Sequence, residues 1–198
     1  MNKPLFLFVG RSASGKTTIA NILEEKYGYK QVSSYTTRPP RYEGEVGHIF
    51  LTEEEFNNLD GIVSYTFYNG YQYGTTAKLL DECSIFVVDV PGVELLLEKY
   101  ETDRPICIIY FNANVYSRIN RMLDRGDSDM MIISRLLTDE KEDWWDKLDF
   151  LTWHYKNIVK KNVVAYSIKA NDDIQNVFER VFYYIEENME EEDNGSSN

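Results

Sequence analysis

Short continuous apolar runs alternate along this chain with stretches that have helical spacing. The runs predict buried parallel strands at Leu5–Val9, Ile85–Val90, Ile106–Phe111 and Val163–Ile168. Apolar residues spaced three and four apart predict helices at Thr17–Tyr27, Val93–Tyr100, Val115–Asp124 and about Asp172 to Glu187. This order predicts an α/β fold with a parallel sheet flanked by helices, and places ligands at the carboxyl ends of the strands.

Two segments interrupt the alternation, and we interpret them as inserts on one core. Residues 33–80 predict short strands, turns and a helix at Glu53–Leu59, for which Thr52 and Glu55 form a capping box. Residues 125–157 are charged, aromatic and of helical tendency. The core then comprises residues 1–32, 81–124 and 158–188, and the acidic residues 189–198 predict a flexible tail.

Composition narrows the classes of partner. The 198 residues carry a formal net charge of −12, which argues against a general nucleic-acid or membrane binder. Cys83 and Cys107 lack metal or redox spacing and are predicted to be buried free thiols. The chain shows neither a signal-peptide pattern nor a run long enough to span a bilayer, so we expect a cytoplasmic protein.

The strongest motif follows the first predicted strand. Gly10-Arg11-Ser12-Ala13-Ser14-Gly15-Lys16-Thr17 matches the phosphate-binding pattern G-x-x-x-x-G-K-[ST] in full. The glycines let successive backbone N–H groups face phosphate oxygens, and the following helix adds its positive end. Lys16 suits the β- and γ-phosphates of ATP, and the Thr17 hydroxyl suits Mg²⁺. The motif in this context predicts the P-loop NTPase fold.

The first insert carries a second site for an anion. Arg38 and Arg41 lie three residues apart in a segment stiffened by Pro39 and Pro40. A guanidinium group can meet a phosphate with two parallel hydrogen bonds, so a rigid pair of arginines suits a monophosphate. By itself this pattern is only moderately specific, and an exposed basic turn is the alternative.

Several motifs in one order make the chain resemble the guanylate kinases. The segment Ser34–Arg41 resembles S-x-T-T-R-x-P-R of that family, and Gly44-Glu45-Val46 continues it. Further matches follow in family order: Gly47-His48-Ile49-Phe50, Glu54-Glu55-Phe56, Gly70-Tyr71-Gln72-Tyr73-Gly74-Thr75, Asp89 in VVDVPG, Arg121, Arg125-Gly126, Arg135 and Asn171-Asp172-Asp173. The resemblance covers nearly all of the chain from Leu5 to Ile185.

The resemblance implies an ATP- and Mg²⁺-dependent nucleoside monophosphate kinase whose first insert binds the acceptor and whose second insert is a helical lid. It implies an ATP site of Gly10, Arg11, Ser12, Ala13, Ser14, Gly15, Lys16, Thr17, Thr18, Arg121, Arg125 and Asn171. It implies an acceptor site of Ser34, Arg38, Arg41, His48, Ser64, Tyr73, Thr75 and Asp89. Lys16, Arg38, Arg125 and Arg135 would neutralise the charge of the transferring phosphoryl group. Asp89 either orients Mg²⁺ or contacts the acceptor, or merely caps a strand.

Two positions depart from the family pattern. Ser64 stands where guanylate kinases carry a glutamate that reads guanine, and a hydroxyl cannot accept the same forked pair of hydrogen bonds. Glu43, Glu45 and Asp60 are the alternative candidates for that acid. His48 stands at a phosphate-binding tyrosine, so it is either a protonated phosphate ligand or a surface histidine.

Two further assignments concern the region of the second insert. Arg118 faces the same side as Arg121 and Arg125 at helical spacing, and we interpret it as a solvated charge rather than a further phosphate ligand. Trp144, Trp145, Trp153 and Tyr155 are predicted to be packing residues rather than a platform for a base.

The leading hypothesis is phosphorylation of GMP or dGMP by ATP, by a monomer or homodimer. The alternative is a kinase for another nucleotide, such as a phage-type deoxynucleotide. A non-catalytic guanylate-kinase-like interaction module is less favoured, because the P-loop is intact.

Overall fold

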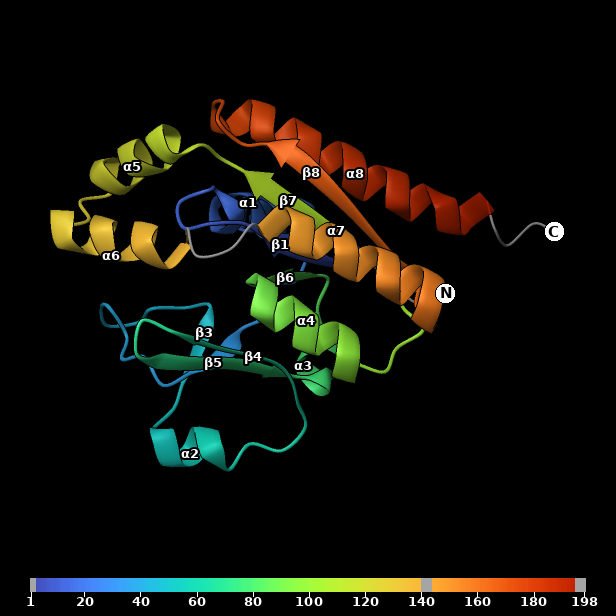
Figure 1. Ribbon diagram of the computed structural model, residues 1–198, viewed down its shortest axis with the longest axis horizontal. Helices are drawn as coiled ribbons and strands as arrows, with labels where there is room; N and C mark the ends of the chain where they lie inside the picture. The colour runs from blue at the N-terminus through green and yellow to red at the C-terminus, as the bar shows by residue number, and fades with distance from the viewer. Residues whose placement is uncertain (1–2, 140–143, 195–198) are drawn as a thin grey trace.

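A computed structural model of the protein describes residues 3–139 and 144–194. Its centre is a parallel sheet of four strands in the order β6-β1-β7-β8 (Figure 1). The strands are β1 (Leu5–Val9), β6 (Ile85–Val87), β7 (Ile106–Asn112) and β8 (Val163–Lys169). In this sheet Leu7 of β1 pairs with Phe86 on one side and with Ile108 on the other. The predicted parallel sheet is therefore confirmed.

Alternate residues of β1 face the two halves of the core. Phe6 and Phe8 join a cluster with α1 and α8, while Leu5, Leu7 and Val9 join a cluster with α4 and α7. Figure 1 shows α8 and α4 on opposite sides of the sheet. The helices are α1 (Lys16–Tyr27), α4 (Val90–Lys99), α7 (Trp144–His154) and α8 (Ile174–Asn194). Because both faces are covered, β1 is buried along its whole length, as its continuous apolar sequence predicts.

A second sheet forms most of the predicted first insert. Its strand order is β3-β2-β5-β4, with β2 parallel to β3 and antiparallel to β5. Its elements are β2 (Ser34–Thr36), β3 (His48–Phe50), α2 (Glu53–Asn57), β4 (Ile62–Tyr68), β5 (Tyr71–Thr76) and α3 (Ala77–Asp81). The predicted capping box is present, because the Thr52 and Glu55 side chains each bond the other's backbone.

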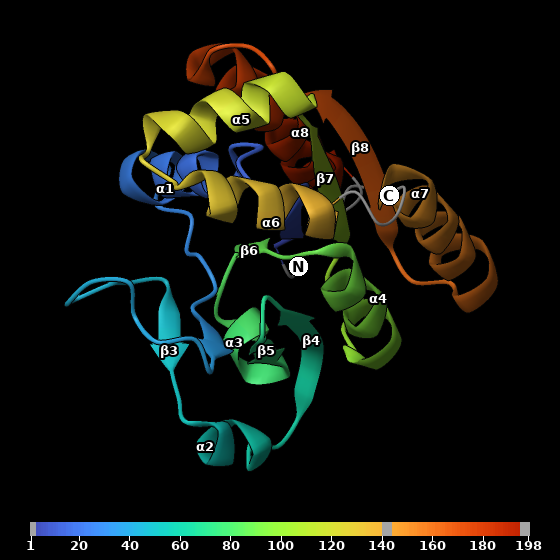
Figure 2. The same ribbon diagram turned by 60° about the vertical axis from the view of Figure 1, so that its left-hand side comes forward.

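The helices α5 (Val115–Asp124) and α6 (Asp129–Asp139) follow β7. In both views α6 lies between α5 and the second sheet, next to the carboxyl ends of the main strands (Figure 2). This position puts α6 between the P-loop and the first insert.

The segment predicted as a lid divides into two parts. Leu148 and Leu151 of α7 are buried in the core cluster that also contains α4 and β7. Helix α7 and the π-helical turn η1 (Tyr155–Val159) both contact β8. Of the described parts of this segment, only α6 has the position expected of a lid, because the apolar face of α7 packs against the main sheet.

Several boundaries differ from the sequence prediction. Helix α4 begins at Val90 rather than Val93, because the Asp89 carboxylate accepts a hydrogen bond from Gly92 N and ends the strand. Helix α8 continues to Asn194 through the segment predicted as a flexible tail. Met189 still packs against the core there, which extends the amphipathic face. Residues 195–198 lie outside the described residues.

Side-chain burial tests the remaining predictions. Cys83 and Cys107 are buried free thiols, as predicted. Trp144, Trp145 and Tyr155 pack against the core, also as predicted, but Trp153 is 55% exposed. Within the described residues, no helix combines the length and the apolar character needed to cross a membrane.

Candidate active site

The P-loop joins β1 to α1 and has the backbone geometry that its glycines predict. Gly10 has a φ of +152°, and a Cβ atom there would lie 2.8 Å from the carbonyl oxygen of Phe111. Gly15 has a φ of +103° and caps the N-terminus of α1. These positions demand glycine because a side chain would meet backbone or force strain.

Lys16 is turned toward the loop itself. Its Nζ atom donates to the carbonyl oxygens of Gly10 at 2.5 Å and Arg11 at 2.9 Å, and to Ser14 Oγ at 3.3 Å. Burial lowers the pKa of Lys16 to about 8, although the nearby Asp139 carboxylate opposes that shift. Thr17 and Thr18 are exposed in the first turn of α1.

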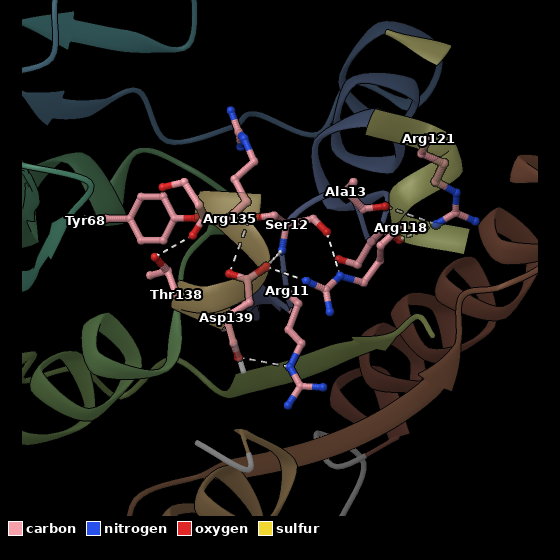
Figure 3. Close-up of polar contacts among 12 residues, drawn as sticks. Arg11, Ser12, Ala13, Tyr68, Arg118, Arg121, Arg135, Thr138 and Asp139 are labelled. Atoms are coloured by element: carbon pink, nitrogen blue, oxygen red, sulfur yellow. Dashed lines mark hydrogen bonds and ion pairs between the residues drawn. The ribbon is translucent and has the colours of Figure 1, made fainter. Parts of the chain in front are cut away.

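Arg118 and Asp139 form a buried ion pair at the P-loop (Figure 3). Arg118 is 0% exposed, so its interpretation as a solvated charge is wrong. Helix α5 turns it inward, where its Nη2 atom lies 2.7 Å from Asp139 Oδ2 and its Nε atom donates to Ser12 O at 3.0 Å. Sequence analysis missed Asp139, whose spacing of four residues from Arg135 on α6 was the one available signal.

A cavity of about 240 Å³ extends from the P-loop to the second sheet. Its lining includes Gly10, Ser12 and Lys16 from the P-loop and Ser34, His48, Ser64, Tyr73 and Gly74 from the insert. The cavity is also lined by Thr66, Tyr68, Asp89, Gly92, Asp139 and Trp144, together with Phe86, Val87 and Val88. The Tyr68 hydroxyl lies 3.2 Å from Ser12 Oγ, so Tyr68 links the insert to the P-loop.

Asp89 and Ser64 lie side by side in this cavity. Asp89 Oδ1 accepts hydrogen bonds from Thr66 Oγ1 at 2.8 Å and Gly92 N at 2.9 Å. Burial raises the pKa of the Asp89 carboxyl, while these two bonds lower it. Ser64 Oγ donates to Gly92 O at 3.0 Å. Asp89 is therefore both a helix cap and a wall of the cavity.

The acceptor arginines are organised by one carboxylate, Glu45. Arg38 Nη2 lies 2.8 Å from Glu45 Oε1, and Arg41 N donates to Glu45 Oε2 at 2.6 Å. The Arg38 guanidinium holds the pKa of Glu45 down at about 2, against the opposing effect of burial. Glu45 is therefore bound to the arginines and does not line the cavity; neither do Glu43 and Asp60.

Two buried polar atoms in the described part of the chain have no hydrogen-bond partner: Arg38 Nε and Thr75 Oγ1. Both belong to residues predicted to bind the acceptor. Burying an unpaired donor or hydroxyl is costly, so a ligand that bonded to either atom would remove part of that cost.

His48 lines the cavity between Ser34 and Tyr73. Its Nδ1 atom lies 3.0 Å from Ser34 Oγ, and its ring packs edge-on to Tyr73. Burial lowers the pKa of His48, and the Arg38 charge lowers it further. Of the two predicted alternatives for His48, this lowered pKa disfavours the protonated ligand in the nucleotide-free protein.

The other predicted arginines lie on α5 and α6 and at the C-terminal end of α5. Arg121 donates to the carbonyl oxygens of Ala13, Ser14, Ala170 and Asp172. Arg125 and Arg135 both pair with Asp127, Arg135 through Nε at 3.5 Å. These two charges lower the pKa of Asp127. Asn171 Oδ1 accepts from Asn114 N at 2.7 Å, which ties the loop after β8 to the start of α5.

A dedicated metal cage is absent from the described residues, where no three His, Cys, Asp or Glu side chains gather. Mg²⁺ in phosphoryl-transfer sites is held by one or two protein oxygens together with the substrate phosphates. The exposed Thr17 hydroxyl beside Lys16 fits that mode of binding.

Comparisons with known proteins agree with the motifs and the fold. The chain is 35% identical to the guanylate kinase of Helicobacter pylori over 152 residues, which is 70% of this chain and 72% of the relative. It is 29% identical to the guanylate kinase of Fusobacterium nucleatum over 151 residues, covering 70% of this chain and 80% of the relative.

The fold is also found among solved structures. The guanylate kinase structure from Anaplasma phagocytophilum superposes with a TM-score of 0.54 at 15% identity, covering 96% of this chain and 88% of the other. No family model matches the chain. The relatives, the shared fold and the intact P-loop together show that the chain belongs to the guanylate kinase family of nucleoside monophosphate kinases.

Proposed function

We propose that the protein transfers the γ-phosphoryl group of ATP to a nucleoside monophosphate, with GMP or dGMP as the favoured acceptor. The observation that carries the proposal is the single cavity lined by both the P-loop and the insert. A donor and an acceptor bound at its two ends would have their phosphates close together, which is the main requirement of this reaction.

The donor end is supported by the P-loop and Lys16. The backbone N–H groups and the helix α1 provide a cradle for the phosphates, and Lys16 would exchange its bonds to loop carbonyls for bonds to phosphate oxygens. When bound, Mg²⁺ supplies further neutralisation of phosphate charge, and Thr17 would hold it. Arg121 and Asn171 would then lie on the outer side of the ATP site.

The acceptor end is supported by Arg38, Arg41 and Thr75. Arg38 Nε and Thr75 Oγ1 are buried without partners, so an acceptor that bonds them relieves an existing cost. Glu45 holds the Arg38 guanidinium and the backbone N–H of Arg41 before any ligand arrives. Ser34, Tyr73 and the neutral His48 complete the polar wall on this side.

Closure would bring the remaining arginines to the transferring group. Arg125 and Arg135 would leave Asp127 for the equatorial oxygens of the phosphoryl group, whose negative charge they stabilise. The reaction needs little proton chemistry from the protein. Water is excluded when α6 and the insert approach each other, and this limits hydrolysis of ATP.

One observation favours a second acceptor. Ser64 Oγ is already engaged with Gly92 O, and Asp89 is the one carboxylate on that wall of the cavity within the described residues. A single aspartate with one oxygen already bonded discriminates guanine less sharply than two carboxylates would. A kinase for a different deoxynucleotide is therefore the second candidate.

A coupled spectrophotometric assay with ATP and each common NMP and dNMP tests both candidates. We expect the highest kcat/KM with GMP or dGMP, and no turnover for Lys16→Ala. A greater kcat/KM with a pyrimidine nucleotide would replace the first candidate by the second. Failure of every acceptor, with no ATP binding by calorimetry, would refute the kinase proposal.

A further inference from the structure

The ion pair of Arg118 and Asp139 encloses one residue of the P-loop. Asp139 Oδ2 accepts from Ser12 N at 2.7 Å, and Asp139 Oδ1 lies 3.3 Å from Ser12 Oγ. Arg118 donates to Ser12 O at 3.0 Å (Figure 3). Two side chains from α5 and α6 therefore contact both the backbone and the side chain of Ser12, whose hydroxyl also lies 3.2 Å from the Tyr68 hydroxyl.

The surroundings of Asp139 Oδ2 are those of a phosphate oxygen. It receives a hydrogen bond from a backbone amide of the phosphate-binding loop and another from a guanidinium group, both at 2.7 Å. Charge-assisted bonds of these two kinds are what a glycine loop and an arginine offer to a phosphate. The carboxylate thus fills a position that the motif builds for an anion.

The pair is poorly explained as a device for stability alone. Arg118 and Asp139 are 0% and 1% exposed, so both charges are removed from water. Desolvation of a buried ion pair commonly offsets its attraction, and apolar residues of similar volume often stabilise as well or better. A simple attachment of α6 to the P-loop would not require either charge.

The position of Asp139 makes the exchange of one anion for another possible. It is the last residue of α6, the helix that also carries Arg135 and lies over the cavity. An ATP phosphate that reached Ser12 N would meet the negative carboxylate, so α6 would have to shift and withdraw it. The same shift would leave Arg118, anchored on α5, beside the phosphate.

We propose that Ser12 N and Arg118 form a phosphate-oxygen site for the donor nucleotide, and that the Asp139 carboxylate fills this site in competition with ATP. The inference rests on the proposed function, because it names an additional ligand of the same donor. Arg118 is then a phosphate-binding residue, and Asp139 is an internal competitor that ATP displaces.

The two roles predict opposite effects on ATP binding. Asp139→Ala removes the competing anion, so we expect the Kd of ATP with Mg²⁺ to fall by about tenfold, the size of one charge-assisted hydrogen bond. Arg118→Leu removes the ligand, so the Kd rises by about tenfold or more and kcat falls with it. Isothermal titration calorimetry on the full chain measures the Kd of ATP, and the coupled assay measures kcat.

Control variants separate this role from a structural one. Glu94→Gln removes one carboxylate from the exposed pair that Lys147 Nζ makes with Glu94 at 2.8 Å, and it should leave the Kd of ATP unchanged. The double variant Arg118→Leu/Asp139→Ala leaves no buried charge unpaired and should fold even if a single variant does not. We expect it to bind ATP more weakly than Asp139→Ala, with a reduced kcat.

The results that would overturn the inference differ from those that would overturn the kinase. If Asp139→Ala weakens ATP binding or changes it less than twofold, Asp139 is not a competitor. If the double variant turns over like the wild type, Arg118 does not bind phosphate. In both cases the wild type still binds ATP, whereas failure of the wild type to bind ATP would contradict the proposed function itself.

Discussion

The Thr75 hydroxyl should lower the stability of the nucleotide-free enzyme and should strengthen the binding of its acceptor. Thr75 lies on β5 opposite Ser64 of β4, is 0% exposed, and its Oγ1 atom has no hydrogen-bond partner. Thr75→Val keeps the shape of the side chain and removes the unpaired hydroxyl. We therefore expect this variant to be more stable than the wild type without nucleotide, and to use the acceptor less well.

The magnitude follows from the cost of burying a polar group without a partner, about 1–3 kcal/mol. Taking the lower end, a gain of about 1 kcal/mol raises Tm by roughly 2–4 °C in a domain of this size. If an acceptor normally satisfies the hydroxyl, losing that bond should raise the acceptor KM by about tenfold. The KM for ATP should not change.

Thr36 offers a matched control in the same sheet. It is also 0% exposed, but its Oγ1 atom donates to Gln72 O at 2.9 Å and accepts from Arg38 N at 3.1 Å. Thr36→Val leaves these two groups without their partner and should lower Tm by several degrees. Differential scanning calorimetry with and without GMP compares the two variants directly.

Two results would refute this reasoning. A lower Tm for Thr75→Val, of the size seen for Thr36→Val, would mean that the Thr75 hydroxyl is already satisfied in the protein. A higher Tm combined with an unchanged acceptor KM would mean that the acceptor does not reach Thr75.

Three further predictions concern the donor and acceptor sites. Because burial lowers the pKa of Lys16 to about 8 and only its ammonium form binds phosphate, kcat/KM for ATP should fall above about pH 8; a profile flat to pH 10 would contradict this. Glu45→Gln should destabilise the fold by about 3–5 kcal/mol because it leaves the buried charge of Arg38 without a carboxylate, whereas the exposed Glu43→Gln should be neutral in thermal unfolding. Since the pKa of Glu45 is lowered from 4.5 to about 2, the stability from this pair is present above pH 4.5 and is lost as the pH falls toward 2. Gly10→Ala should abolish ATP binding in calorimetry, because its Cβ would lie 2.8 Å from Phe111 O; retained binding would show that the loop can shift.

The sequence predicts the parts of the fold that depend on local pattern. The run Leu5–Val9 is apolar at every position because both faces of β1 are covered, and this alone distinguishes it from an exposed strand. The P-loop is equally local, since Gly10 and Gly15 are required by backbone geometry. The capping box at Thr52 depends on two residues three apart and is likewise visible in the sequence.

Contacts between distant segments could not be predicted in this way. Helices α6 and α7 carry the same number of charged residues, and only the packing of Leu148 and Leu151 assigns α7 to the core. Arg118 has the spacing of a surface residue on α5, but α6 covers it and brings Asp139 to it from 21 positions away. Burial of a charge depends on what covers it, and periodicity within one helix contains no such information.

The net charge of the sequence likewise does not predict how charges are paired at the candidate site. A net charge of −12 predicts a field that repels nucleotides, yet four arginines of the candidate site are each paired with a carboxylate. Arg38 pairs with Glu45, Arg118 with Asp139, and Arg125 and Arg135 with Asp127. Because these carboxylates already fix their arginines, the arginine side chains lose less entropy when a ligand binds. A phosphate that replaces such a carboxylate meets an arginine that is already in position. Local preorganisation can therefore bind an anion that the overall charge disfavours.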